Sequence, residues 1–166
     1  MSQLKRLLVG TRETITGTVY GTIVVLASVT AAGRLYLRDL WRLEVIVAAT
    51  VLVLWLAHVY SDALGESLRV GRRLTAAELG RVASHESAIP LAAVLPMAAV
   101  ALGALGVIDG GTAVWIALGI GIGTLALEGL SYARLERLSL LATVASVAIN
   151  LAVGLVIVLL KVLVSH

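Results

Sequence analysis

One stretch of the chain, WLAHVYSDALGESLR at 55–69, carries an imidazole and two carboxylates at regular four-residue spacing. Residues four apart in a helix are neighbours on one face. His58, Asp62 and Glu66 would therefore form one polar stripe, which could coordinate a divalent cation or relay protons. The competing interpretation is the ordinary polar end of an amphipathic helix, with Glu66 solvated and Asp62 paired to an arginine or a tyrosine.

The stripe follows an almost purely apolar run, and similar runs recur along the chain. Of the 166 residues, 60% are hydrophobic and 14% are charged, whereas soluble domains are about 25% charged. Segments 113–127 and 151–164 have no polar face, which argues against a soluble helical core. The sequence predicts an all-α integral membrane protein, because helices satisfy their backbone hydrogen bonds within the bilayer. The Ala-, Val-, Leu-, Gly- and Arg-rich composition points to a bacterial plasma membrane.

Five segments are long enough to cross a hydrocarbon core of about 30 Å, namely 14–32, 44–64, 88–108, 112–131 and 139–163. Nine of the 13 basic residues fall at the N-terminus or in the loops after the second and fourth segments. The positive-inside rule then places the N-terminus in the cytoplasm and the C-terminus outside. Thr75 and Glu78 match a capping box, which predicts a short cytoplasmic helix over about 76–86. We expect a single transmembrane domain, a five-span helical bundle over 1–166.

Polar side chains within these segments gather towards the predicted cytoplasmic side. At about 1.5 Å per residue, His58 lies about 12 Å in from Glu66, and Tyr20 about 9 Å in from the start of its segment. Glu128 lies about 5 Å from the end of the fourth segment. Polar groups at such depth are costly, so they indicate function. The candidate ion-binding residues are His58, Asp62, Glu66, Tyr20 and Glu128, with the first three as candidate metal ligands. Tyr20 could instead be an interfacial aromatic anchor.

Small and amide side chains at four-residue spacing predict close helix contacts. Gly17 and Gly21 form one such pair, and Ser146, Asn150 and Gly154 form a second series. Small residues let helix backbones approach one another in a membrane, and an amide adds a hydrogen bond. These faces could meet another span or a second subunit, or the second series could line a pathway.

Several functional classes find no support in the sequence. It has no nucleotide-binding loop, no Gly-x-Ser-x-Gly pattern and no cysteine. Ser61 and His58 would lie on one helix, which is poor geometry for a nucleophile and its base. We therefore expect no enzymatic activity and no cofactor apart from a transported metal ion. The net charge of +3 is explained by orientation in the bilayer rather than by a nucleic-acid partner.

The order of these features resembles the vacuolar iron transporter family and its bacterial relatives. The family pattern Ser-Met-x-x-Gly-Glu-Tyr at the end of the second span is approached by Ser61-Asp62-Ala63-Leu64-Gly65-Glu66-Ser67. The family's Asp-Gly in the first span is approached by Tyr20-Gly21, and its leucine- and proline-containing third span by AAVLPMAAVALGALG (92–106). The resemblance implies the five-span fold and a homodimer with a pathway near the subunit interface.

The departures from the family pattern concern its metal chemistry. The first-span aspartate of the family is Tyr20 here, and its methionine is Asp62. Its glutamate-rich cytoplasmic helices are reduced to a segment with Glu78 and Glu86. The first hypothesis is thus a small transporter-like protein that handles a cation, either a divalent metal or a proton-coupled substrate. The second is a non-transporting scaffold or partner-binding subunit that uses the polar stripe, and the third is a pH sensor acting through His58.

Overall fold

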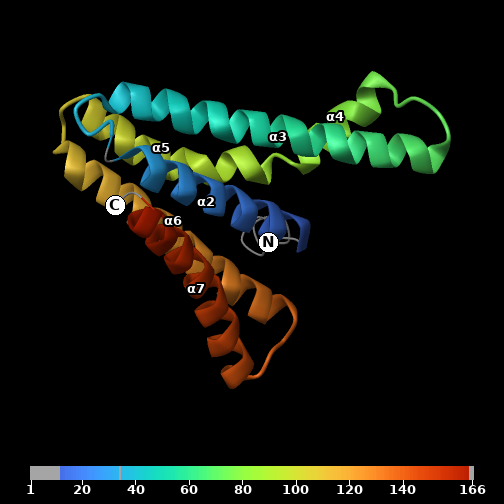
Figure 1. Ribbon diagram of the computed structural model, residues 1–166. Helices are drawn as coiled ribbons and strands as arrows, with labels where there is room; N and C mark the ends of the chain where they lie inside the picture. The colour runs from blue at the N-terminus through green and yellow to red at the C-terminus, as the bar shows by residue number, and fades with distance from the viewer. Residues whose placement is uncertain (1–11, 34, 165–166) are drawn as a thin grey trace, which may run out of the picture.

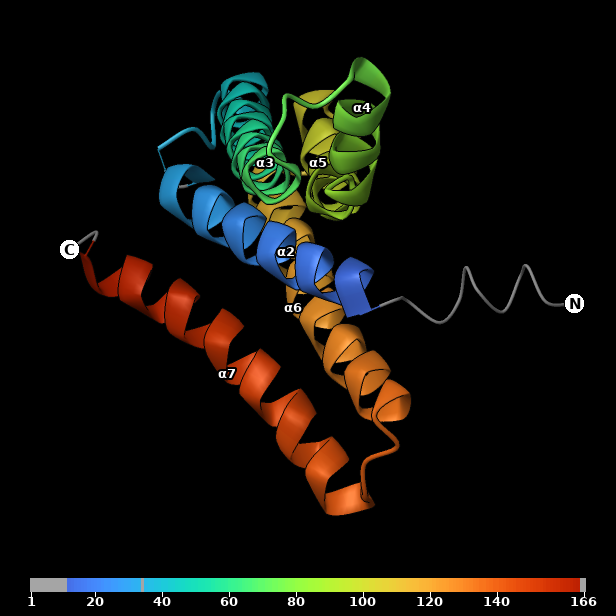
Figure 2. The ribbon, with the colours of Figure 1, turned by 90° about the vertical axis from the view of Figure 1, so that its right-hand side faces the viewer.

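The computed structural model describes residues 12–33 and 35–164, and every regular element in this part of the chain is an α-helix. Figure 1 shows their order: α2 (Arg12–Gly33), α3 (Leu40–Val70), α4 (Ala76–His85), α5 (Ala88–Ala104), α6 (Gly110–Leu135) and α7 (Leu140–Val164). Helix α2 lies in the middle and packs against α3, α5, α6 and α7. Helices α3 and α5 lie together on one side of α2, and the α6–α7 hairpin lies on the other (Figure 2).

The ends of the helices separate into two groups (Figure 1). We call the end at which α3 finishes and α4 lies the α4 end, and the end with the connections 35–39 and 105–109 the far end. The α6–α7 hairpin diverges from α3 towards the α4 end (Figure 1). Arg69 lies in the last turn of α3 there, and Arg72 and Arg73 follow the end of the helix. Three basic residues used in the predicted orientation, Lys5, Arg6 and Arg34, lie outside the described residues.

Local capping sets where the helices begin and end. Asp39 and Asp109 accept hydrogen bonds from amides in the first turns of α3 and α6, at 3.2 and 3.0 Å, which satisfies free backbone donors. Gly71 ends α3 with a φ of 67°, a left-handed conformation that favours glycine. Thr75 and Glu78 form a complete capping box at the start of α4. The helix predicted over about 76–86 is therefore confirmed.

Helix α2 occupies the centre because small residues let its neighbours approach closely. Gly17 and Gly21 face α5, and a Cβ atom added at Gly21 would lie 2.5 Å from the carbonyl oxygen of Ile89. On another face, the fully buried Leu26 fills the space beside Gly121 of α6, where a Cβ would lie 2.7 Å from Leu26 Cδ2. The two predicted small residues of α2 thus lie at its contact with α5.

The second small-residue series lies on the face of α7 that packs against α6. The Ser146 hydroxyl donates a hydrogen bond to the Gly129 carbonyl across this contact (3.1 Å). Asn150 donates to the Ser146 carbonyl within α7 (3.0 Å). A Cβ at Gly154 would lie 2.7 Å from Leu125 Cδ1. This face, for which another span or a second subunit was expected, therefore meets α6 of the same chain.

Three helices of the described part are long and apolar enough to cross a membrane: α2 from Thr14, α3 and α6. They are compatible with an integral membrane protein. Helices α4 and α5 count as a fourth span only if taken together, and they are bent by 48° at the break between them. Helix α7 qualifies only as a shorter apolar helix over Leu140–Val156. Length and apolarity therefore support three or four spans, where the sequence predicted five.

The difference at the third predicted span has a simple physical cause. That span was expected over 88–108, but α5 ends at Ala104, and Gly106 adopts a φ of 74° just beyond it. The remaining 17 residues extend about 26 Å, which is less than the hydrocarbon core of about 30 Å. Helix α3 differs in the opposite direction, since it covers Leu40–Val70 instead of the predicted 44–64.

The contact between α2 and α5 predicts different effects for two glycine substitutions. Gly21→Ala should destabilise the protein by about 1–3 kcal/mol, because the new methyl group would overlap the α5 backbone. Gly119→Ala in α6 has nothing within 4 Å of the new Cβ, and should be neutral or stabilising by up to about 1 kcal/mol. Thermal unfolding in detergent, followed by circular dichroism, measures both. Equal midpoints for Gly21→Ala and the wild type would contradict this packing.

Candidate functional site

The ring of His58 contacts the ring of Tyr20 between α3 and α2. Their centroids are 4.6 Å apart and the planes are tilted by 47°. His58 Nδ1 lies 3.0 Å from the Leu54 carbonyl oxygen of its own helix, so a proton on this nitrogen could be donated to that oxygen. The ring is half-buried. The structure therefore brings together two of the predicted ion-binding residues from different helices.

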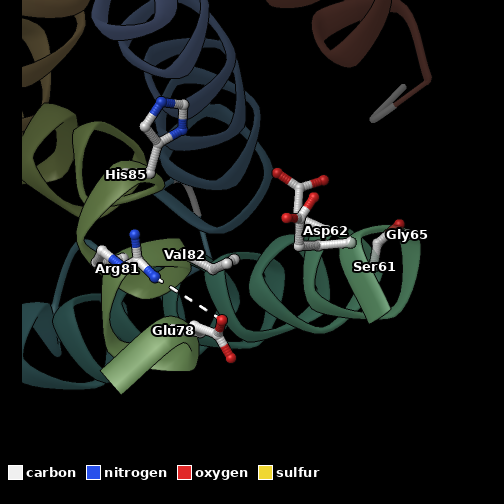
Figure 3. Close-up of a pocket in the computed structure, with 8 residues that line it drawn as sticks. Ser61, Asp62, Gly65, Glu78, Arg81, Val82 and His85 are labelled. Carbon is white, nitrogen blue, oxygen red and sulfur yellow. Dashed lines mark ion pairs between the residues drawn. The ribbon is translucent and has the colours of Figure 1, made fainter. Parts of the chain in front are cut away.

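Asp62 lies one helical turn further along α3, beside a cavity of about 480 Å³ between α3 and α4. Figure 3 shows Ser61, Asp62 and Gly65 of α3 on one side and Glu78, Arg81, Val82 and His85 of α4 on the other. Asp62 is exposed and makes no ion pair or hydrogen bond with the described residues. Its carboxylate is therefore available to a solute in this cavity.

The two glutamates beside the same cavity are neutralised by arginines. Arg69 binds both carboxylate oxygens of Glu66, at 2.6 and 2.8 Å. Arg72 binds both oxygens of Glu78, at 2.8 and 3.0 Å. Together with the amide and hydroxyl of Thr75, Arg72 holds the pKa of the Glu78 carboxyl well below its ordinary value. The Arg72–Glu78 pair fixes the connection between α3 and α4, whereas the Arg69–Glu66 pair lies within α3. Among the described residues, Asp62 remains as the unpaired carboxylate of the cavity.

A second cavity, of about 300 Å³, lies between α2, α3 and the junction of α4 with α5. Tyr20 and His58 line it together with His85 and Glu86. His85 Nδ1 lies 3.7 Å from a carboxylate oxygen of Glu86, a separation that permits an ion pair when the imidazole is protonated. This cavity brings two imidazoles and a carboxylate to the phenol of Tyr20.

A third cavity, of about 380 Å³, lies on the other side of α2, facing α6 and α7. Tyr20 lines it as well, with Glu128 and Tyr132 of α6 and Asn150 of α7. Glu128 is half-buried and makes no ion pair or hydrogen bond with the described residues. It is thus the second carboxyl at the α4 end that no described cation neutralises.

The three cavities adjoin one another. The first two share His85, and the second and third share Thr16 and Tyr20. We call six of the ionisable residues that line them the polar belt; these are Tyr20, His58, Asp62, His85, Glu86 and Glu128. The belt runs around α2 at the α4 end and joins four of the five predicted ion-binding residues.

The predicted metal ligands do not form a metal centre. Among the described residues, no group of three His, Asp or Glu side chains is arranged so that it could hold a metal ion. Glu66 is bound by Arg69, and one nitrogen of His58 faces a backbone carbonyl. Four-residue spacing places His58, Asp62 and Glu66 along one face of α3 but does not make their side chains converge on one point, because each turn separates them by about 5.4 Å.

The candidate ion-binding residues predicted from the sequence do not include His85, Glu86 or Glu44, which the structure places beside a cavity or in the core. His85 and Glu86 join the belt because the break between α4 and α5 turns them towards Tyr20. Their position directly before the third predicted span was the available signal. Glu44 is buried near the far end of α3. It is the first residue of the apolar run 44–54, at which the second span was predicted to begin.

Comparison of the chain with protein-family models, curated proteins and solved structures finds no match. The resemblance to the vacuolar iron transporter family therefore remains a hypothesis that rests on the quoted motifs and the order of the predicted spans.

The Arg72–Glu78 pair predicts an acid-sensitive connection between α3 and α4. Because the pKa of Glu78 is lower in the folded protein than its ordinary value of about 4.3, its contribution to stability is complete above that value and is lost as the pH falls below it. Amide hydrogen exchange in α4, corrected for intrinsic rates, should accelerate on acidification from about pH 5 to 3. Glu78→Gln should accelerate it already at neutral pH.

Glu66→Gln is the matched control, because it removes a similar bidentate pair that lies wholly within α3. Exchange in α4 should be unchanged in this variant. Equal exchange in Glu78→Gln and the wild type would show that the pair does not hold α4.

Proposed function

We propose that this protein is a five-span protein of the bacterial plasma membrane that handles a cation, with proton coupling, at the polar belt. The observation that carries the proposal is the position of two unneutralised carboxyls, Asp62 and Glu128, on opposite sides of the Tyr20–His58 contact. Carboxyls and imidazoles near the membrane interior are costly and are typical of ion and proton pathways. Here they share adjoining cavities.

The charge of the belt favours a cationic ligand. Arg69, Arg72 and Arg81 each pair with a glutamate, the last across 4.0 Å in the wall of the first cavity. None of them forms an ion pair with Asp62 or Glu128. Cavities with one sign of charge and apolar walls concentrate ions of the opposite sign. Since no described group of three ligands fits a metal ion, we favour protons or a hydrated or organic cation over a dehydrated divalent metal. Imidazole side chains often serve as proton shuttles in proteins, which suits proton coupling.

In the proposed topology, α5 and α7 complete the five spans, and the α4 end faces the cytoplasm. Four arginines lie between 69 and 81, and two more lie at 134 and 137; this concentration of basic residues is typical of cytoplasmic loops. The bend between α4 and α5 would let the amphipathic α4 lie along the membrane surface.

The second candidate function is a non-transporting, partner-binding subunit. It is supported by the position of the three adjoining cavities of the polar belt at one end, the α4 end. A partner that covers the belt should co-purify in stoichiometric amount from native membranes and dissociate when Asp62 and Glu128 are neutralised. The homodimer implied by the family resemblance likewise remains a proposal, which mass measurement in detergent would test.

The proposed transport predicts loss of ion flux in belt variants. In liposomes that contain the purified protein, Asp62→Asn, Glu128→Gln and His58→Gln should each reduce proton or cation flux at least about tenfold. Loss of one interaction with a charged group costs about 1.5–3 kcal/mol, and 1.4 kcal/mol is a factor of ten. Internal pH dyes and radioactive or fluorescent cation uptake measure the flux.

Two control variants make the same kinds of substitution at positions outside the belt. Asp109→Asn removes a carboxylate at the far end while asparagine still caps α6. Tyr60→Phe removes an exposed phenol of α3 and is compared with Tyr20→Phe. Both controls should retain wild-type flux. Wild-type flux equal to that of empty liposomes for protons and for several cations would refute the transport proposal and favour the partner-binding function.

The topology predicts a labelling pattern that is easily read because the chain has no cysteine. Cysteines placed at Arg73 or Arg134 should be shielded from a membrane-impermeant maleimide in intact cells. Cysteines at Leu35 or Val107, in the far-end connections, should react. Permeabilisation should expose all four. Reaction of Arg73→Cys in intact cells would reverse the proposed orientation.

A further inference from the structure

Glu44 is the only charged side chain among the buried described residues. It lies one turn inside α3 at the far end, and only 8% of its surface is exposed. Its Oε1 atom has no hydrogen-bond partner in the described part of the chain. An ionised carboxylate in such a place would lose most of its hydration, which is far more costly than burying a neutral acid.

The helices around Glu44 offer no described cation. Helix α5 packs against this part of α3, and the backbone of Ala101 faces the carboxyl group. Residues Ala88–Ala104 include no ionisable side chain at all. In the part of α2 beyond residue 13, Tyr20 is the ionisable residue. Its ring contacts His58 and not Glu44.

The charged groups nearest to Glu44 along the chain are engaged or exposed. Arg42 lies over the ring of Tyr36, with its guanidinium carbon 5.6 Å from the ring centroid. The Asp39 carboxylate accepts a hydrogen bond from the Arg42 amide, and Arg38 is exposed. In α6, Asp109 caps its own helix, and Glu128, Tyr132 and Arg134 lie towards the α4 end. The ionisable residues of α4, Glu78, Arg81 and His85, also lie at that end.

We propose that the Glu44 carboxyl is a proton-binding site at the far end. It holds a proton as a neutral carboxylic acid while α3 lies against α5, and it releases that proton to water when the two helices separate locally. On release, the O–H bond breaks, the electron pair stays on the carboxylate, and the proton passes to water that enters from the far end. This assignment concerns Glu44 alone and does not depend on transport at the polar belt.

Glu44 and the belt residues of α3 lie on the same face of this helix. Apolar side chains pack between them. His58 is 14 residues further along the helix, which corresponds to about 21 Å. The buried Val47 and Val51 lie between them on the packed face. Protons therefore do not pass directly from Glu44 to His58 in this arrangement. The protein would carry one proton-binding position near each end of α3, each open to its own side.

Infrared spectroscopy of the full-length protein in lipid bilayers tests the proposal. A protonated carboxyl group has a C=O stretching band that is distinct from the bands of a carboxylate, and deuterium exchange shifts it. The wild type should show this band at neutral pH and lose it when the pH is raised. Glu44→Gln should lack the titrating band throughout, because glutamine has a similar shape but no acid. Glu128→Gln and Asp109→Asn, measured in parallel, identify any contribution from other carboxyls.

Glu44→Asp provides a second test should the glutamine variant fail to fold. It keeps the acid and shortens the side chain, so the titrating band should shift in frequency and persist. Two results would overturn the proposal. If the wild type and Glu44→Gln do not differ in the protonated band at any pH from about 5 to 9, Glu44 is ionised and paired with a cation. If the Glu44 band stays constant throughout that range, the acid is a fixed structural group that does not exchange its proton.

Discussion

The close approach of α2 to α5 is the contact on which the remaining architecture depends. The Gly21 position leaves no room for a Cβ beside the Ile89 carbonyl, and this lets α2 lie deep enough to touch four other helices. Tyr20 directly precedes this glycine. Because the backbone is fixed there, its ring reaches His58 on one side of α2 and the Glu128 cavity on the other. A packing constraint between small residues thus determines the polar arrangement.

The distribution of neutralised and unneutralised acids gives the molecule its chemical character. At the α4 end, the bidentate Arg72–Glu78 pair holds the exposed connection between α3 and α4, and the Arg69–Glu66 pair lies within α3. Exposed pairs of this kind contribute little stability individually, but they remove Glu66 and Glu78 from the set of available acids. Asp62 and Glu128 remain at this end, and Glu44 remains at the other. The unpaired acids are therefore found where a helix faces a cavity or a purely apolar neighbour.

Much of the helical pattern could be predicted from local signals. The capping box at Thr75 and Glu78 located α4, and apolar length located the central parts of α2, α3 and α6. The errors arose at helix ends. Asp39 starts α3 four residues before the apolar run begins, so Glu44 falls inside the helix. Gly106, in a left-handed conformation, follows an α5 that is too short to span the bilayer by itself.

The sequence by itself determined the helical class, the apolar segments, and the set of polar residues placed at costly depth. These properties follow from composition and from the 3.6-residue period, which act within one segment. Only the tertiary structure decided which of those residues meet. Tyr20 contacts His58, and both line one cavity with His85 and Glu86. Glu66 pairs with Arg69, and Glu44 is buried against α5. Periodicity defines the face on which a side chain lies, whereas its partners depend on how neighbouring helices pack against that face.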